Sequence, residues 1–253
     1  MDATDPVTAR PSPPELDPHI ATYYGEQYAE AERLSVSAIG RLECERTKEL
    51  LLRFLPSAPA RVLDVGGGPG VYAAWLAALG YQVTMLDPIP LHRRQAAAHG
   101  TFEVGAGDAR RLTQPDASAD VVLLLGPLYH LVEAEDRAAA LREAARVVRP
   151  GGMIAAAFIS RQAPIIDVTA RLRGSDDATH RILSTLEHRG VNDFESGFTV
   201  AYFHTLAEIL LASRLVEDRP EYLEAALRAA RLADAHPELI PGSAHLLAVT
   251  ADT

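Results

Sequence analysis

The sequence predicts an α/β fold built on a mostly parallel sheet with helices on both faces. Between residues 61 and 159, short apolar segments typical of buried strands alternate with helical segments, as they do in sheets covered on both sides. A glycine-rich turn, Gly66–Gly70, joins the first of these strands to the helix that follows it. The length of 253 residues is enough for one domain with a large core and a lid.

The segment before the sheet, residues 1–55, is expected to form an arm and lid helices. Met1–Pro18 is polar, acidic and proline-rich, which is typical of a loosely docked arm. Glu15–Leu34 should contain one or two short helices, and Val36–Leu55 a longer one with an apolar stripe. The stripe consists of Ile39, Leu42, Leu50, Leu51 and Phe54.

The domain proper, residues 56–253, begins with alternating strands and helices. Its first five strands are expected at Arg61–Val65, Gln82–Leu86, Phe102–Gly105, Asp120–Gly126 and Met153–Ile159. Helices are expected at Val71–Leu79 and at Leu141–Val148, and the second should end in the turn Arg149–Gly152.

A polar and irregular stretch at about residues 160–203 interrupts this alternation and is interpreted as an inserted helical cap. Beyond it, Leu206–Leu215 and Glu221–Ala235 read as helices, Val216–Pro220 as a weak strand and Ala244–Thr250 as a final strand. The sheet would then have seven strands.

Composition narrows the range of functions. The net charge of −10 argues against a nucleic-acid partner, although a local basic groove at Arg93–Arg94 and Arg110–Arg111 stays open. Cys44 is the single cysteine, so neither an internal disulfide nor a thiolate metal site is expected. Without a membrane-length apolar run or a leader pattern, a cytoplasmic protein is expected, and homo-oligomerisation is left open.

The glycine turn suggests a ligand site. Glycines let the backbone approach a ligand closely, and the helix after the turn offers free N–H groups to an anionic group. Asp64 lies two residues before the first glycine, and Asp87 closes the second strand, where a carboxylate can accept both hydroxyls of a ribose. Nicotinamide-dinucleotide folds use a similar turn, so an NAD-dependent oxidoreductase is an alternative.

Further segments in the required order make the pattern more specific. They are Gly107–Arg110 after the third strand, Gly126–Leu131 after the fourth, and Arg149–Gly152 before the fifth. Together with the turn they resemble the class I S-adenosylmethionine-dependent methyltransferases of the bacterial small-molecule type, closely over about residues 61–160 and loosely beyond.

The resemblance implies a Rossmann-like sheet with an antiparallel last strand, and S-adenosylmethionine as cofactor with S-adenosylhomocysteine as product. It implies that Asp64 and Gly66–Gly70 lie near the methionine part, Asp87 on the ribose, and Asp108 with Ala109 beside the adenine. The cofactor contacts expected in this way are Asp64, Gly66, Gly67, Gly68, Gly70, Asp87, Pro88, Gly107, Asp108, Ala109, Leu125, Gly126 and Tyr24.

The proton-transfer candidates follow from position at the strand ends. His130 is the first choice for a base because imidazole titrates near neutrality, and Tyr129 beside it is expected to position the acceptor. His204, before a helix that should border the pocket, is the second choice. Each histidine could instead serve only in packing or capping. Tyr23, Tyr24 and Tyr28 are expected either to close over the cofactor or to dock the arm.

The predicted function is methyl transfer to the oxygen, nitrogen or electron-rich carbon of a small molecule, in specialised metabolism. Leu125–Tyr129 lacks the Asn/Asp-Pro-Pro-aromatic turn of enzymes that methylate nucleobase amines, and Gly126–Pro127 offers no metal ligand. No nucleic-acid, membrane or metal partner is therefore expected. A non-catalytic S-adenosylmethionine-binding protein is the other alternative.

Overall fold

The computed structural model describes residues 15–27, 30–161, 163–164, 184, 188–192, 199–205, 208–209 and 245–250. The expected arm before residue 15, Tyr28 and the segments expected as helices or strand between residues 210 and 244 lie outside this set. So does most of the expected cap.

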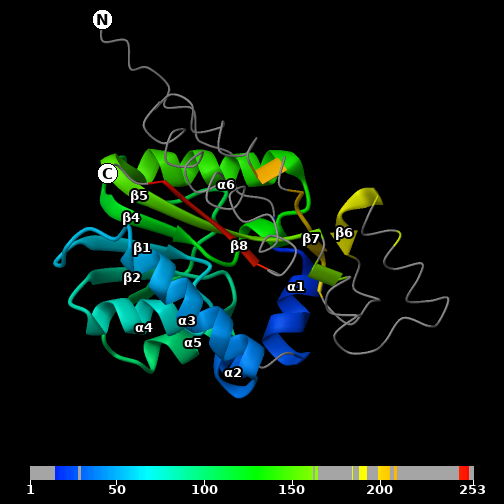
Figure 1. Cartoon of the computed structure of the whole chain (residues 1–253), viewed down its shortest axis with the longest axis horizontal. Helices are drawn as coiled ribbons and strands as arrows, with labels where there is room; N and C mark the ends of the chain where they lie inside the picture. Colours follow the sequence, from blue (N-terminus) through cyan, green and yellow to red (C-terminus); the bar gives the residue numbers. More distant parts are fainter. Residues whose placement is uncertain are drawn as a thin grey trace, which may run out of the picture.

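A single twisted sheet forms the centre of the described chain (Figure 1). Its strand order is β3-β2-β1-β4-β5-β8, parallel throughout except that β8 runs antiparallel to β5. The strands are β1 (Arg61–Val65), β2 (Gln82–Leu86), β3 (Glu103–Gly105), β4 (Ala119–Leu124), β5 (Val148–Ile159) and β8 (His245–Thr250). The antiparallel last strand is confirmed. The described sheet has six strands rather than seven, because Val216–Pro220 is outside the described residues.

Helices cover both faces of this sheet (Figure 1). The helical elements of the described residues are α1 (Pro18–Thr22), a π-helical turn (Tyr23–Gln27), α2 (Glu30–Val36), α3 (Ala38–Leu52), α4 (Val71–Ala78), α5 (Pro90–Ala97), a 3-10 turn (Leu128–His130) and α6 (Ala134–Val147). Side chains of α6 pack with Val122 and Leu124 of β4, whereas α3, α4 and α5 pack with Val121 and Leu123. Successive side chains of β4 thus point into the two hydrophobic cores on opposite faces of the sheet, as expected for a strand that is buried on both faces.

The long helix expected from residue 36 is divided at Ser37. The Ser37 hydroxyl accepts a hydrogen bond from the Gly40 N–H at 2.8 Å and so caps the start of α3. Only the end of α3 reaches the sheet core, where Leu51 is fully buried, while Leu42 is 70% exposed. The prediction of one apolar stripe was therefore wrong at Leu42.

The turn expected at Arg149–Gly152 is instead part of β5. Val148 pairs with Ala119, and a shift in register follows before Val121 pairs with Met153. Gly152 lies so close to the Asp120 carbonyl oxygen that a Cβ would be 2.7 Å from it. The glycine therefore permits the irregular start of the strand.

The described part of the expected cap contains a short antiparallel ladder between β6 (Val191–Asn192) and β7 (Ala201–Tyr202) rather than helices alone. The chain after β7 is attached to the end of β5, since the His204 N–H donates to the Ile159 carbonyl at 2.8 Å. This attachment holds residue 200 beside the strand ends. Among the described residues, no helix is long and apolar enough to cross a membrane.

Candidate active site

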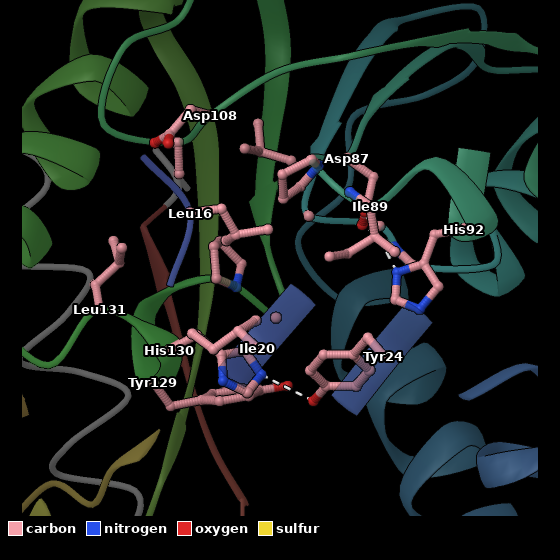
Figure 2. Close-up of a pocket in the computed structure, with 18 of the residues that line it drawn as sticks. Leu16, Ile20, Tyr24, Asp87, Ile89, His92, Asp108, Tyr129, His130 and Leu131 are labelled. Atoms are coloured by element: carbon pink, nitrogen blue, oxygen red, sulfur yellow. Dashed lines mark hydrogen bonds and ion pairs between the residues drawn. The ribbon is translucent and has the colours of Figure 1, made fainter. Parts of the chain in front are cut away.

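A cavity of about 550 Å³ opens at the carboxyl ends of the parallel strands, where ligands bind in open α/β sheets. Its walls come from the turn after β1, the end of β2, the segment after β3, the loop after β4 and the N-terminal helices (Figure 2). All but one of the residues expected at the cofactor line it, and the exception is Gly70. The lining residues expected from the sequence are Tyr24, Asp64, Gly66, Gly67, Gly68, Asp87, Pro88, Gly107, Asp108, Ala109, Leu125, Gly126, Tyr129 and His130.

The glycine turn presents bare backbone to this cavity. Gly68 has φ +58°, and a Cβ there would meet only the Glu30 side chain, at 3.8 Å, so space for a ligand lies against it. Gly66 has φ +69° and packs on the loop after β4, where a Cβ would come 3.0 Å from the Pro127 ring. Only glycine combines these dihedral angles with such close approach.

Asp87 is clamped at the end of β2 by the protein itself. Its Oδ2 accepts a hydrogen bond from the Gly68 N–H at 2.9 Å, and its Oδ1 accepts one from the Ile89 N–H at 2.8 Å. The Nδ1 atom of His92 lies 3.3 Å from the same Oδ1 (Figure 2). Since a carboxylate has about four lone-pair positions, roughly one strong position remains on Oδ2 for a ligand hydroxyl.

Asp64 is a buried carboxyl group, 1% exposed, at the end of β1. Neither of its oxygens has a hydrogen-bond partner among the described residues, although the group lines the cavity. Burial, with a smaller contribution from the charge of Asp87, raises its pKa to about 7. A cationic ligand group would complete this site and favour the ionised form.

Asp108 is held by Arg110 at the opposite end of the cavity. The Asp108 carboxylate accepts from the backbone N–H of Arg110 at 2.8 Å and from its guanidinium at 2.9 and 2.6 Å. The same guanidinium reaches Asp136 at 3.0 Å. Asp108 and the neighbouring Ala109 are thereby fixed in the cavity wall next to the end of β3.

His130, Tyr24 and Tyr129 meet at the end of β4 (Figure 2). The Nδ1 of His130 lies 3.2 Å from the Val200 carbonyl, which can only accept, so we assign the proton to Nδ1. Nε2 then accepts a hydrogen bond from the Tyr24 hydroxyl at 2.8 Å. The Tyr129 hydroxyl lies close to Gly126, 3.8 Å from where a Cβ would be.

Burial keeps the two hydrogen-bonded partners uncharged. It lowers the pKa of His130 to about 4 and raises that of Tyr24 well above its usual value. The imidazole is therefore neutral at neutral pH, and its basic nitrogen, Nε2, accepts the hydrogen bond from Tyr24.

His204 does not line the cavity. Its ring is 3% exposed and packs edge-on against Phe158 and Tyr202, with centroid distances of 4.9 and 4.8 Å. Its backbone forms a bridge to Ser160 at the end of β5. Because His204 does not line the cavity and its ring packs against Phe158 and Tyr202, we do not carry it forward as a proton-transfer group.

His92 and Arg33 are among the cavity residues that the sequence analysis missed. His92 follows Asp87 by five residues, a spacing that brings a side chain in the first turn of a helix back to the strand end. Arg33 donates to Glu30 at 2.7 Å and to Glu43 at 2.8 Å, and lines the cavity. The three-residue spacing of Glu30 and Arg33 was a usable signal.

Comparison with known proteins gives a consistent result. Residues 63–156 match a family model described as a methyltransferase domain. An uncharacterized methyltransferase of Mycobacterium tuberculosis is 37% identical over 130 residues, which cover 49% of this chain and 51% of that protein. A ubiquinone biosynthesis O-methyltransferase of Methylobacterium nodulans is 36% identical over 114 residues, 43% of this chain and 45% of that protein. The chain thus spans about half the length of the curated relatives it matches.

Solved structures agree on the fold. A methyltransferase dependent on S-adenosylmethionine from Mesorhizobium loti has a TM-score of 0.53 at 21% identity, covering 79% of this chain and 95% of that chain. Another from Methanosarcina mazei has a TM-score of 0.54 at 22% identity, covering 66% of this chain and 82% of that chain. Because the sequence identities are this low, these structures show only that the chain shares their Rossmann-like α/β fold.

Proposed function

We propose that this chain is a class I S-adenosylmethionine-dependent methyltransferase, which the match of residues 63–156 to a methyltransferase-domain model supports, and that it transfers a methyl group from that cofactor to a small-molecule acceptor. In this proposal, residues 1–55 act as arm and lid over a methyltransferase domain of residues 56–253. The role in specialised metabolism rests on the arginine- and alanine-rich composition alone.

The donor groups of the cavity fit the cofactor. The unpartnered carboxyl group of Asp64 suits a cationic part of the methionine moiety, and the open acceptor position of Asp87 suits a ribose hydroxyl. Asp108 and Ala109 are assigned to the adenine. The bare backbone at Gly68 leaves room for the cofactor to lie against the turn. The observation that carries the proposal is this pairing of an orphaned Asp64 with a clamped Asp87 across the glycine turn.

When bound, the cofactor supplies a methyl group that is electrophilic because it is attached to positively charged sulfur. The protein residues then have to align the acceptor, exclude water and accept a proton. We assign proton acceptance to Nε2 of His130, which the Val200 carbonyl orients through Nδ1–H. Tyr129 is assigned to acceptor positioning, because its hydroxyl lies near Gly126 at the same strand end.

The N-terminal segment supplies the cover over this chemistry. Ile20 and Tyr24 are buried against Ile89, which lies two residues after the assigned ribose-binding residue Asp87. Arg33, which is held by the carboxylates of Glu30 and Glu43, lines the cavity from the same N-terminal segment. The lid thus closes the cavity and contributes charge to it.

Calorimetry with S-adenosylhomocysteine and with NAD tests the cofactor assignment, and tight binding of S-adenosylhomocysteine alone is expected. A mass-shift screen with S-adenosylmethionine against phenols, amines and indoles tests the activity through a gain of one methyl group. Preferred binding of NAD would reject the proposal. Binding without methylation of any acceptor would favour the non-catalytic alternative.

A further inference from the structure

A side chain of the protein itself occupies the place beside the assigned base. The Tyr24 hydroxyl donates to Nε2 of His130 at 2.8 Å, and the Val200 carbonyl fixes the opposite ring nitrogen as a donor. Nε2 can therefore only accept a hydrogen bond, and its donor in this structure is the phenol group of Tyr24. Any molecule that takes its place must also bring an O–H or N–H donor.

The surroundings of the Tyr24 ring form an aromatic slot. The ring is 8% exposed and packs with Ile20 and Ile89. Its edges meet two imidazoles, His92 at a centroid distance of 5.4 Å and His130 at 5.2 Å. Such edge-on contacts suit a flat aromatic ring rather than an aliphatic chain.

The charges around this slot disfavour an ionised acceptor. Arg33 is the cation that acts on Tyr24, and it is bound by the carboxylates of Glu30 and Glu43. The carboxylate that acts on His130 is Asp87. An anionic acceptor would therefore meet negative charge at this end of the cavity, and the two groups that it would touch are themselves neutral.

On the basis of the proposed methyl transfer, we propose that the acceptor is an uncharged phenol whose ring and hydroxyl take the place that Tyr24 holds in this structure. Tyr24 lies on the short π-helical turn Tyr23–Gln27, so its withdrawal from the slot requires movement only of the N-terminal segment. Tyr24 thus plugs the acceptor position until a phenol replaces it.

In this methyl transfer the phenol oxygen gains a methyl group and loses a proton. The phenol oxygen forms a bond to the methyl carbon while the carbon–sulfur bond breaks, and that electron pair stays on sulfur. The phenolic proton passes to Nε2 of His130 and from there to water. The products are an aryl methyl ether, a neutral thioether and one proton.

The test uses p-cresol, which is the tyrosine side chain as a free molecule, with the full-length variant Tyr24→Ala. In the complex with S-adenosylhomocysteine, the variant should bind p-cresol about five- to tenfold more tightly than toluene, because only p-cresol can donate to Nε2. With S-adenosylmethionine, the variant should convert p-cresol into 4-methylanisole faster than the unmodified protein does.

Tyr81→Ala is the matched control, since it removes a tyrosine ring that does not line the cavity and whose hydroxyl donates to the Pro56 carbonyl at 2.7 Å. It should treat p-cresol as the unmodified protein does. If the alanine variant fails to fold, Tyr24→Phe is the second variant. It keeps the aromatic ring but loses the hydrogen bond to Nε2 of His130, so p-cresol should displace the ring more easily and should also be methylated faster.

Three outcomes would overturn the inference while cofactor binding stays intact. They are equal affinity for p-cresol and toluene, binding of p-cresol without methylation, and methylation of p-toluidine in preference to p-cresol. Failure of the unmodified protein to bind S-adenosylhomocysteine would instead reject the proposed function. Measuring that affinity first therefore separates the two proposals.

Discussion

Replacing Asp87 by alanine is expected to weaken both cofactor binding and the ligand-free fold. The carboxylate satisfies the buried N–H groups of Gly68 and Ile89, at 2.9 and 2.8 Å. Leaving a buried donor unsatisfied costs about 1–3 kcal/mol, so the two together should lower the free energy of unfolding by about 2–6 kcal/mol. From sequence position alone, the same substitution would be expected to leave the fold intact.

The binding effect is separate from this cost. The remaining acceptor position on Asp87 would give the ribose one charge-assisted hydrogen bond, worth about 1.5–3 kcal/mol, which is roughly a ten- to hundredfold loss of affinity. Loss of the contact that orders Gly68 adds to it, so the worked value is a lower bound.

Two measurements check the reasoning. Urea unfolding of the ligand-free variant gives the stability change, and calorimetry with S-adenosylhomocysteine at a temperature where the variant is folded gives the affinity. Asp116→Ala is a control, because that side chain is 79% exposed and pairs only at the surface with Arg146. An unchanged dissociation constant would place the ribose elsewhere, and an unchanged unfolding free energy would contradict the clamp.

Three further predictions concern titratable groups of the site. His130→Phe should lower kcat about 10²–10⁴-fold and change the affinity for S-adenosylhomocysteine little. Since the pKa of His130 is about 4, its protonation should not lower kcat of the unmodified protein between pH 8 and pH 5.5. Methylation rates of the variant and the unmodified protein, measured across that pH range, check the loss of kcat and the flat pH profile. Asp64 is protonated in the native state up to a pKa of about 7 but ionises near 3.8 when unfolded, so it lowers stability by about 1.4 kcal/mol per pH unit as the pH rises between those values. Asp64→Asn should remove that loss, and parallel stability curves for both proteins in urea melts at pH 5 and pH 7 would contradict it. In His92→Asn the amide N–H can replace the Nδ1–H of His92 as the donor to Asp87. Calorimetry should therefore show that this variant binds S-adenosylhomocysteine about two- to tenfold more tightly than His92→Gln does. Equal affinities would show that the 3.3 Å contact between His92 Nδ1 and Asp87 Oδ1 does not contribute to binding.

The sequence by itself determined the sheet and the position of the cavity. Residues at the ends of parallel strands must meet at one edge, so the order Asp64, Asp87 and Asp108 along the chain was enough to predict that they share a site. The apolar segments likewise predicted strands covered on both faces, because alternate residues of a buried strand face opposite layers.

Contacts between distant segments were decided only by the tertiary structure. Tyr24 and His130 are 106 residues apart, and no local pattern relates an N-terminal turn to the loop after β4. The helical period of α3 could be predicted from the sequence, but the 70% exposure of Leu42 could not.

The chemistry of the site also depended on burial. His130 and His204 looked alike as residues near strand ends, yet His130 lines the cavity whereas His204 packs against Phe158 and Tyr202. The pKa values of Asp64 and His130 depart from their usual values because the folded chain removes both groups from water. A residue type sets which proton a side chain can exchange, whereas desolvation and neighbouring charge, which exist only after folding, set the pH at which it does so.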